Sequence, residues 1–340
     1  MTEPAVSGES SKWRAAVIGC GWIGSGVADD PRADGIQAHA AAYTACADTE
    51  LVGVCDADPA RAEQAARRWG LRRGLGEVSE LLAGVRPQIV SVCTPDATHA
   101  AVLREVLSSA DIRAVIVEKP VALDLAEARS MVDLARSRGV TLAVNHTRRF
   151  APSHIEAHRR ILAGDIGRVL AVTGVYTKGI LHNGTHWFDL AHWLVGRITR
   201  VQAWPGATDP ARPDPTCHAR MIFADGQTGF LLGMDEERYT IFEMDIMGTS
   251  GRLRISDSGM RLAWYSVAES PHFSGYRTLQ SPEVAAAGFK DVALRMVENV
   301  VAALRQRIQP RCSGENGVAA LAAADAARRS LATGIECTVE

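Results

Sequence analysis

The sequence lacks several features that would place it in a specialised class of proteins. It has no apolar run of membrane-spanning length, and its first twelve residues are polar, without the apolar core of a signal peptide. We expect residues 1–12 to form a frayed tail. The formal net charge is only −2, which argues against a nucleic-acid partner or an anionic membrane surface. It contains no internal repeat and no low-complexity segment.

The cysteines also lack a recognisable pattern. None of the seven forms a C-x-x-C pair, so the sequence predicts no zinc site and no other metal. Cys20, Cys55 and Cys93 lie in strand-like runs, where buried free thiols are usual, and we expect a reducing, cytoplasmic setting. With 340 residues, 47% of them hydrophobic and 22% charged, the chain is long enough for two ordinary globular domains.

The most informative pattern begins at residue 14. Residues 15–18 form a short apolar run typical of a buried parallel strand, and they lead directly into 19–24, GCGWIG, a G-x-G-x-x-G. The first glycine permits a tight turn, the second lets a pyrophosphate touch the backbone, and the third lets the next helix pack closely. The phosphates would lie on N–H groups at a helix N-terminus, which predicts a dinucleotide site.

A second apolar run, 50–55, ends in Asp56. A carboxylate at this strand end can accept both ribose hydroxyls of an adenosine and would repel a 2′-phosphate, so Asp56 favours NAD. Arg61 follows five residues later and leaves NADP open. The separation of Gly24 from Asp56 is longer than in the usual unit, and the excess is the polar segment 25–37. We interpret 25–37 as an insertion, either a lid or a surface loop.

Strands and helices alternate through the rest of the first half. Strands are expected at 88–93, 113–117 and 141–145, and helices at 60–70 and 123–138. This order predicts a doubly wound parallel sheet, in which ligands bind beyond the carboxyl ends of the strands. The residues that fall at those ends are Thr94, Pro95, Glu118, Lys119 and Asn145.

After residue 150 the pattern changes to alternating strands joined by short turns, which indicates a large and mainly antiparallel open sheet. A helix is expected at 153–163, and two terminal helices at 284–306 and 317–333. The expected strands are 169–176, 199–204, 218–223, 228–234, 241–247 and 252–255. The predicted fold class is therefore α/β, with a Rossmann-type sheet followed by an α+β domain.

Histidines gather in the segment 178–196, KGILHNGTHWFDLAHWLVG. Asn183 or Thr185 can cap a helix that begins near His186, and Asp189 then lies on the same face as His186. The positive end of the helix would favour a neutral imidazole, which is what a general base needs near pH 7. Asp189 could orient that imidazole. The alternative is a structural histidine that a cap satisfies.

Four segments together resemble one known family. The segments GCGWIG, CTPDATH, VEKPVALDLAEA and NHTRRF are similar to those of the glucose–fructose oxidoreductase, inositol dehydrogenase and rhizopine-catabolism (Gfo/Idh/MocA) family of NAD(P)-dependent dehydrogenases. The resemblance runs from about residue 13 to the C-terminus. It implies a Rossmann domain at 13–146 and a domain for substrate binding and oligomerisation at 147–340. The terminal helices of the second domain are expected to pack back on the first, and the open sheet to form a homodimer or homotetramer.

The resemblance also implies roles for single residues. In the family, the lysine of the Glu-Lys-Pro motif lies between nicotinamide and substrate and donates to the reacting oxygen, a role that falls on Lys119. The following proline, here Pro120, often has a cis peptide bond, and Glu118 would hold the loop. The family's acid/base histidine corresponds to His186. Its aspartate, four residues earlier, is replaced by His182, which either binds substrate together with His186, the reading we favour, or forms a relay with it.

These considerations give a complete expected site. The catalytic residues are Lys119, His186 and His182. The cofactor-binding residues are Gly19, Gly21, Trp22, Ile23, Gly24, Asp56, Thr94, Pro95, His99, Glu118, Lys119 and Asn145. The substrate-binding residues are Lys119, Arg149, Lys178, His182, His186 and Asp189. His99 is equally compatible with a local backbone bond at a helix start, and Lys178 and Tyr176 with surface positions on an edge strand.

The predicted function is a hydride transfer between a nicotinamide and a secondary alcohol or ketone of a sugar, nucleotide sugar or cyclitol. Lys119 would polarise the oxygen and His186 would take or return its proton. Two alternatives stay open. One is a sensor that binds dinucleotide and sugar without turnover, and the other is an enzyme that uses the cofactor transiently for an elimination or epimerisation.

Overall fold

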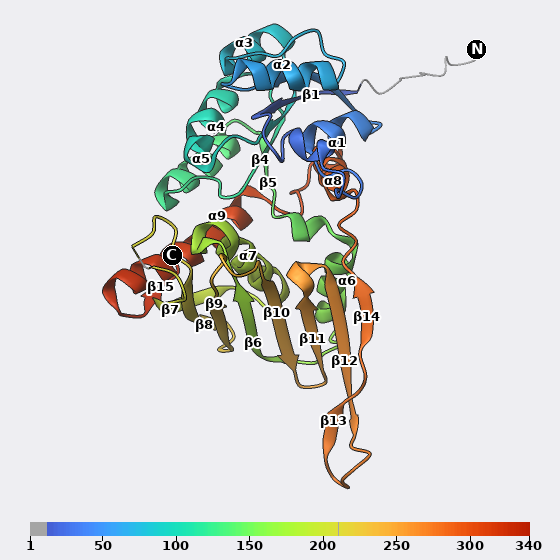
Figure 1. The fold of residues 1–340 in the computed structure, drawn as a ribbon, viewed down its shortest axis with the longest axis vertical. Helices are drawn as coiled ribbons and strands as arrows, with labels where there is room; N and C mark the ends of the chain where they lie inside the picture. Colours follow the sequence, from blue (N-terminus) through green and yellow to red (C-terminus); the bar gives the residue numbers. More distant parts are fainter. Residues whose placement is uncertain (1–11, 210) are drawn as a thin grey trace, which may run out of the picture.

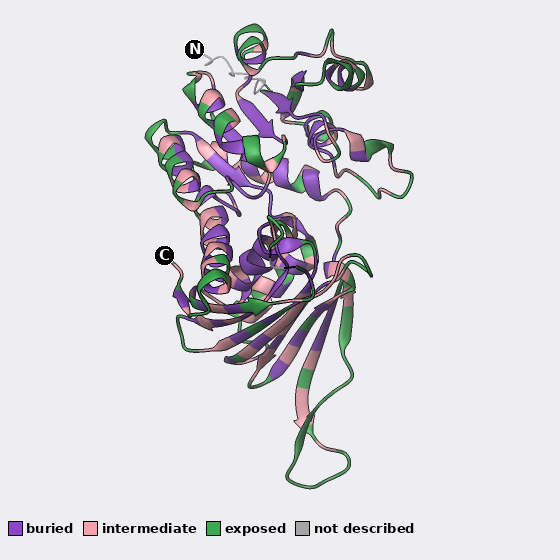
Figure 2. Cartoon of the chain, turned by 60° about the vertical axis from the view of Figure 1, so that its left-hand side comes forward, coloured by how far each residue is buried: buried purple, intermediate pink, exposed green. Residues whose placement is uncertain are grey.

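The computed structural model describes residues 12–209 and 211–340. Residues 1–11 of the expected tail therefore lie outside the described part. The chain forms two sheets, one above the other in Figure 1, with helices around the upper sheet and between the two. Buried residues concentrate in the upper sheet and on the helices between the sheets (Figure 2).

The first half forms a five-stranded parallel sheet in the order β2-β1-β3-β4-β5. Its central strands β3 and β4 are apolar except for Ser91 and are buried along their whole length, because helices cover both faces. The strands are β1 (Trp13–Ile18), β2 (Thr49–Cys55), β3 (Ile89–Val92), β4 (Ala114–Val117) and β5 (Thr141–Val144).

Two helices of this half begin at a capping aspartate. Asp58 caps α2 by accepting from the N–H groups of Ala60 and Arg61, with Pro59 in the first position, and Asp124 caps α5 by accepting from the N–H of Glu127. The helices are α1 (His39–Ala45), α2 (Pro59–Arg68), α3 (Val78–Val85), α4 (His99–Ser108) and α5 (Leu125–Ser137).

The glycine motif does not open a regular α-helix, contrary to the expectation. The chain makes one short 3₁₀ helix, Gly26–Asp29, and then runs irregularly to α1. The remainder of the insertion 25–37 packs against the far end of the chain: the N–H of Ile36 donates to Asp291 Oδ1 at 2.8 Å. The insertion therefore interrupts the helix that the motif normally starts.

The second half forms a ten-stranded sheet in the order β13-β12-β11-β10-β6-β9-β8-β7-β15, with β14 also paired to β12. The pairing is antiparallel except between β6 and β9, which are parallel. Strands such as β8 alternate buried and half-buried residues because helices cover one face only. The strands are β6 (Val169–Tyr176), β7 (Ile198–Pro205), β8 (Cys217–Phe223), β9 (Thr228–Gly233), β10 (Phe242–Gly248), β11 (Gly251–Ser256), β12 (Arg261–Glu269), β13 (Arg277–Leu279), β14 (Glu283–Ala286) and β15 (Cys337–Thr338).

One expected helix is wrong in its first third. The helix predicted at 284–306 begins only with α8 (Val292–Gln306), and β14 occupies the preceding segment. Gly288 (φ +72°) and Asp291 (φ +58°) lie in the left-handed region, which a helix cannot pass through. Strands β12 and β13 were not expected either, and they build the arm that projects from the sheet in Figures 1 and 2.

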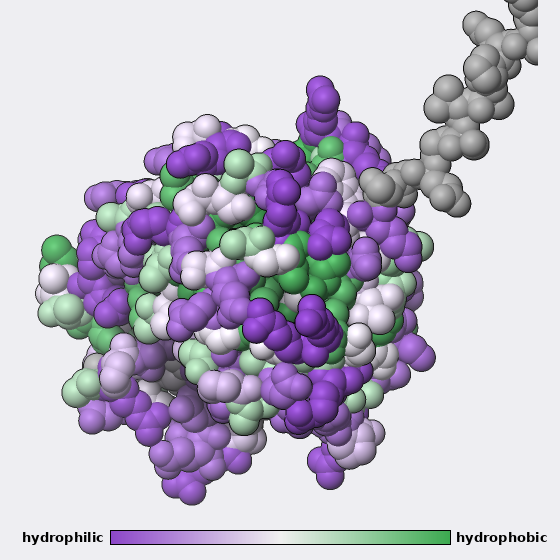
Figure 3. Space-filling view, turned by 90° about the horizontal axis from the view of Figure 1, so that it is seen from above, coloured by the Kyte–Doolittle hydropathy of each residue, from purple (hydrophilic) through white to green (hydrophobic). Residues whose placement is uncertain are grey.

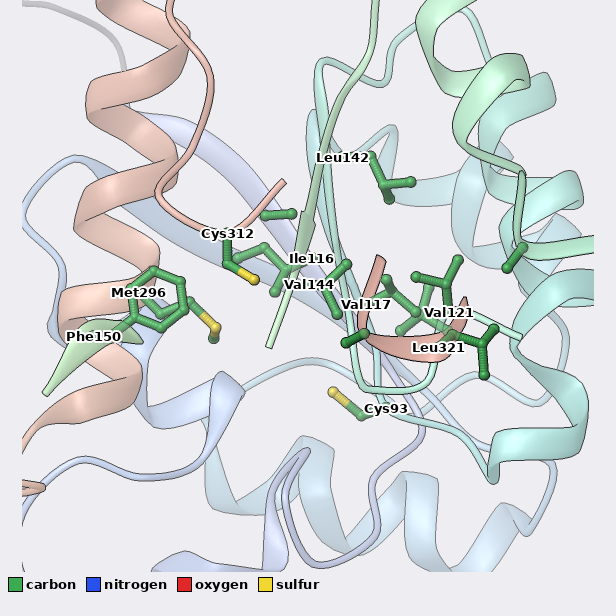
Figure 4. Packing of buried hydrophobic residues seen from close by; sticks show 14 of the residues in the cluster. Cys93, Ile116, Val117, Val121, Leu142, Val144, Phe150, Met296, Cys312 and Leu321 are labelled. Atoms are coloured by element: carbon green, nitrogen blue, oxygen red, sulfur yellow. The ribbon is translucent and has the colours of Figure 1, made fainter. Parts of the chain in front are cut away.

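Of the remaining helices, α8 lies beside α1 at the first sheet, and the others lie between the two sheets (Figure 1). The remaining helices are α6 (Pro152–Leu162), a π-helical turn (Gly179–Gly184), α7 (Thr185–Leu194), α8, and α9 (Gly314–Thr333). A capping box between Ser313 and Asn316 starts α9. A Cβ at Gly317 would lie 2.7 Å from Val144 Cγ2, so α9 rests directly on β5. Val144, Leu142 and Leu321 belong to one buried cluster, seen in Figure 4.

The predicted fold class, an α/β chain with a Rossmann-type sheet and a mainly antiparallel second sheet, is confirmed. We propose the domain border at residue 146, just after β5. Helix α8 contacts α1, and α9 contacts α5 and β5, so both terminal helices touch the first sheet's layer. Within the described residues, no helix is both long and apolar enough to cross a membrane. From above, apolar residues reach the surface only in patches between hydrophilic ones (Figure 3).

Candidate active site

A cleft of about 1150 Å³ opens at the carboxyl ends of the parallel strands and extends to the π-helical turn and α7. Of the residues expected from sequence, the cleft is lined by Gly19, Gly21, Trp22, Ile23, Asp56, Thr94, Pro95, Glu118, Lys119, Asn145, His182 and His186. Its lining does not include Gly24, His99, Arg149, Lys178 or Asp189, nor any residue of the insertion. Lining residues that the sequence did not single out include Asp58, Glu77, Asp96 and Thr147.

The glycine loop has the shape that a dinucleotide requires. A Cβ at Gly19 (φ +92°) would lie 2.5 Å from the backbone of Cys93, and a Cβ at Gly24 would collide with the carbonyl oxygen of Gly19. A Cβ at Gly21 would meet nothing within 4 Å, so the cleft is open at the glycine that the pyrophosphate approaches. Thr94 Oγ1, also in the cleft, is buried without a hydrogen-bond partner among the described residues. Both features fit a bound dinucleotide.

Asp56 stands at the end of β2 with its carboxylate fixed by the backbone. Oδ2 accepts from the N–H of Cys20 at 2.8 Å, and Oδ1 accepts from the N–H of Asp58 at 2.9 Å. Arg61 also lines the cleft, with Nη1 3.5 Å from Asp56 Oδ1. The guanidinium therefore lies beside the carboxylate that is expected to bind the ribose hydroxyls.

Glu118 anchors the loop that carries Lys119. One carboxylate oxygen accepts from Asn145 Nδ2 at 2.6 Å and lies 2.9 Å from His39 Nε2, and His39 Nδ1 lies 2.7 Å from Ser91 Oγ. Burial acts to raise the pKa of Glu118, but the hydrogen bonds from His39 and Asn145 outweigh it, and the pKa is lowered overall. Sequence reasoning missed His39. The one signal that could have indicated it was its position at the start of an alanine-rich helix.

Lys119 is almost buried, with 7% of its surface exposed, and follows directly from Glu118. Its Nζ donates to His182 Nδ1 at 2.9 Å and to the carbonyl oxygen of His182 at 3.3 Å, and the Lys119–Pro120 peptide bond is cis. Burial lowers the pKa of Lys119, and the charge of Glu118 opposes that shift. The ammonium group is therefore held at the cleft by a histidine of the second half.

Asp214 fixes the turn that carries His182. Its two carboxylate oxygens accept from the N–H groups of Leu181 and His182 at 2.8 and 2.9 Å, and burial raises its pKa. The expected helix cap is absent: Thr185 Oγ1 donates to the carbonyl oxygen of Leu181, and the π-helical turn continues directly into α7. His186 therefore does not lie at a free helix N-terminus.

His186 is paired with a histidine rather than with a carboxylate. Its Nδ1 lies 3.3 Å from Nδ1 of His146, and the two rings meet edge to face. Burial, followed by the charge of Lys119, lowers the pKa of His186, while burial lowers the pKa of His146 to about 4. The neutral imidazole that the sequence predicts is present, but burial and neighbouring cations produce it. His146 lay unrecognised within the motif NHTRRF.

Arg149 and Asp189 form an ion pair in the interior. Arg149 Nη2 and Asp189 Oδ1 are 2.9 Å apart, and both side chains are almost completely buried. Asp189 therefore binds Arg149 instead of orienting His186, and the structure places neither residue at the cleft. Tyr176 is also in the core, where its hydroxyl donates to the carbonyl oxygen of Cys217. Lys178 is exposed, in a left-handed conformation (φ +68°), outside the cleft lining.

His99 ties two loops together instead of lining the cleft. Its Nδ1 lies 2.7 Å from the carbonyl oxygen of Pro120, and its Nε2 lies 2.8 Å from that of Thr94. The ring is completely buried. The structure thus agrees with the backbone-bonding alternative for His99, and any influence on the cofactor passes through the Thr94 and Pro120 loops.

The described residues contain no group of histidine, cysteine and carboxylate side chains with the geometry of a metal site. All seven cysteines are free and buried. Burial raises the pKa of the Cys20 thiol, which borders the glycine loop, to about 12. This thiol is therefore not an activated nucleophile.

Comparisons with known proteins agree with this geometry. A family model described as an oxidoreductase family with an NAD-binding Rossmann fold matches residues 13–146, and the model of its C-terminal α/β domain matches residues 177–339. An inositol 2-dehydrogenase from Rhizobium meliloti is 26% identical over 94% of this chain and 97% of that protein. A myo-inositol dehydrogenase from Streptomyces leeuwenhoekii is 30% identical over 77% and 82%.

The same fold occurs in the crystal structure of an NAD-binding oxidoreductase from Klebsiella pneumoniae. That structure is 20% identical, with a TM-score of 0.81 over 97% of this chain and 99% of that one. The two family models together cover most of the chain, and they confirm the resemblance that its motifs indicate. The chain belongs to the Gfo/Idh/MocA family of oxidoreductases, whose N-terminal domain binds NAD.

Proposed function

We propose that the protein is an NAD-dependent dehydrogenase that oxidises a secondary alcohol of a sugar, nucleotide sugar or cyclitol, or reduces the corresponding ketone. The observation that carries the proposal is that Lys119 and His186, from different halves of the chain, line the same cleft as the open glycine loop. The substrate class follows the inositol dehydrogenases named above, which are similar to this chain over most of its length.

In this mechanism Lys119 donates a hydrogen bond to the hydroxyl oxygen and stabilises the alkoxide that develops there. His186, kept neutral by burial, accepts the hydroxyl proton or returns it in the reverse reaction. NAD, when bound along the glycine loop and Asp56, supplies the hydride acceptor. Because Lys119 and His186 are both fixed by neighbouring side chains, the alcohol meets a site that needs little rearrangement.

His182 acts in this proposal as a partner of Lys119 and a ligand of the substrate. Its Nδ1 bonds Lys119, whereas His186 bonds His146, so the four side chains form two separate pairs. This arrangement supports the substrate-ligand role for His182 over a relay with His186.

The proposal is tested with Lys119→Met and His186→Gln, assayed with NAD against a panel of sugars, nucleotide sugars and cyclitols. Each variant is expected to lose about 100- to 1,000-fold in kcat while NADH binding, measured by fluorescence titration, stays within a few-fold of the unchanged protein. Lys290→Met is the matched control, since Lys290 is exposed and remote from the cleft, contacting Asp34.

Three outcomes separate the alternatives. Stoichiometric NADH formation supports the dehydrogenase, and product without net NADH indicates transient redox chemistry. Binding of NADH and sugar without any product indicates a sensor. Near-normal turnover of both variants would remove Lys119 and His186 from the mechanism.

We also propose that the outer face of the ten-stranded sheet joins two copies of the chain. This face carries a hollow of about 550 Å³ lined by Val175, Phe230 and Leu232, and the last two are exposed. The double change Phe230→Glu, Leu232→Glu is expected to give a monomer by light scattering while NADH binding persists. A monomeric mass for the unchanged protein would overturn this proposal.

A further inference from the structure

The end of the cleft next to Lys119 holds the hydrogen-bond donors of Lys119 and His182. The neighbouring carboxylates are engaged elsewhere: Glu118 by His39 and Asn145, Asp214 by two backbone N–H groups, and Asp189 by Arg149. Asp96 is half-buried, lines the same cleft and acts on Lys119 and His182, but it makes no hydrogen bond or ion pair with either of them. Among the described residues, Lys119 bonds His182 and no carboxylate.

His182 contributes a donor because of its bond to Lys119. An ammonium group can only donate, so His182 Nδ1 accepts the bond at 2.9 Å, and the proton of the neutral ring must lie on Nε2. His182 lines the cleft and is exposed to solvent. The Nε2–H is thus free to donate to an oxygen atom of a ligand. A carboxylate in the same position would instead accept from a sugar hydroxyl.

Arg148 adds a charge that makes no ion-pair contact among the described residues, although Asp189 acts on it at longer range. Its Nη2 donates to the carbonyl oxygen of Ser258 at 3.0 Å, its guanidinium carbon lies 3.5 Å from the centre of the Phe242 ring, and its Nε is buried without a partner. The adjacent Arg149 is fully paired. An unpaired, partly buried guanidinium is costly, and the charge of Arg148 lowers the pKa of both Lys119 and His186. It therefore adds positive potential to the reacting end of the cleft.

From these donors we infer that the substrate carries an anionic group, a carboxylate or a phosphate monoester, close to the carbon that is oxidised. The free Nε2–H of His182 binds one of its oxygen atoms, and the charges of Lys119 and Arg148 stabilise it at longer range. The inference rests on the proposed function for the place of the reacting carbon. Binding of the anionic group can be tested without turnover.

The test is calorimetric titration of the NADH complex with matched rings: glucose, glucuronate and glucose 6-phosphate, and galactose, galacturonate and galactose 6-phosphate. In at least one set we expect an anionic member to bind about tenfold more tightly than the neutral sugar, which is the strength of one charge-assisted hydrogen bond. The uronate and phosphate arms show which anion the site takes. Equal or weaker binding of every anionic sugar would overturn the inference.

Two variants test the assignment to His182. His182→Asp should abolish the preference for the anionic sugar, because it replaces a donor by an acceptor of like charge to the ligand. Asn183→Asp is the matched control: it places the same charge one residue away, and the preference should change less than threefold. An equal loss in both variants would show that general charge, and not the His182 donor, sets the preference, and would refute this assignment.

Failure of the inference and failure of the proposed function give different results. If only neutral sugars are oxidised and the acidic sugars bind no more tightly, the proposed dehydrogenase function stands and the anionic substrate is ruled out. If acidic sugars bind tightly but no sugar yields NADH, the anion site stands and the proposed dehydrogenase function is ruled out.

Discussion

The Nδ1 atoms of His146 and His186 lie 3.3 Å apart, with the two rings meeting edge to face. One ring must donate and the other accept, so the pair can be neutral together but cannot both be charged without strong repulsion. In many active sites a carboxylate holds the catalytic imidazole and stabilises its protonated form. Here a second imidazole takes that place, which keeps His186 in its base form.

The pH dependence of oxidation should show this pairing. The pKa of His186 lies below its ordinary value of 6.5, so the ring is deprotonated already in mildly acidic solution, and kcat/KM for the alcohol should stay level down to below pH 6.5. His146→Asp adds a negative charge that favours the protonated ring, and should move the acid limb to higher pH. A pH profile of both proteins checks this, with thermal unfolding as the control for folding. An unchanged limb would exclude His186 as the titrating base.

The alkaline limb should report on Lys119. Burial lowers the pKa of this ammonium group below its ordinary value of 10.5, so the positive charge that stabilises the alkoxide is lost at lower pH than for an exposed lysine. As the pH is raised, we expect kcat/KM to decline with a midpoint below pH 10.5. Lys119→Arg should remove this alkaline limb because a guanidinium stays charged. An alkaline limb that persists in the arginine variant would have another origin.

His39→Ala should destabilise the protein and lower turnover together. The change leaves the buried carboxylate of Glu118 with Asn145 as its remaining side-chain partner, at a cost of about 1–3 kcal/mol in the free energy of unfolding. The loop with Lys119 then loosens, and kcat falls while NADH affinity changes little. Urea unfolding and steady-state kinetics measure both effects. Tyr43→Phe, which removes only the hydroxyl bonded to Ser91, is the milder control and should leave kcat unchanged.

Asp189→Asn should act through stability rather than substrate affinity. It leaves Arg149 charged and unpaired in the interior, which costs about 3–5 kcal/mol. The double change Arg149→Met, Asp189→Leu should recover most of that loss, because it removes both charges. Urea unfolding distinguishes the three proteins. A variant of full stability with a raised KM would instead restore Arg149 and Asp189 as substrate-binding residues.

Cofactor choice should depend on Asp56 and Arg61 together. Asp56→Ser removes the acceptor of the ribose hydroxyls and frees Arg61, whose Nη1 now lies 3.5 Å from the carboxylate. We expect NADH affinity to fall about tenfold and NADPH affinity to rise. Adding Arg61→Ala should cancel the gain for NADPH. Fluorescence titration with both cofactors measures the change, and unchanged NADH affinity in Asp56→Ser would contradict the assigned role of Asp56.

The sequence predicted the first sheet well because each of its strands contains a short, mostly apolar run near a glycine or proline signal. The second sheet was predicted through β11, where residues alternate, but β12 to β14 were not. Strand β13, in the arm, is exposed throughout, and β14 is exposed except at Ala285, so neither carries such an alternation. The start of α8 was misplaced because residues 284–291 contain alanine and charged residues typical of helices, and left-handed Gly288 and Asp291 end any helix there.

The candidate site shows a similar limit. Lys119 and His186 were found through local motifs, whereas the partners of these residues come from distant parts of the chain. His146 and His186 are 40 residues apart, as are Arg149 and Asp189, and His39 is 79 residues from Glu118. Spacing within one helix suggested that Asp189 orients His186. The spacing could not show that the buried Arg149 forms an ion pair with this carboxylate.

The position of α9 on β5 has a consequence for how the chain is made. The side of the first sheet that faces α9 is completed by Gly314 and Gly317, which lie against Leu142 and Val144, and α8 covers α1 from the same end of the chain. During synthesis the cofactor-binding half leaves the ribosome first, with these apolar surfaces open. Its last layer arrives only when α8 and α9 have been made, so maturation of the cofactor site is tied to synthesis of the second half of the chain.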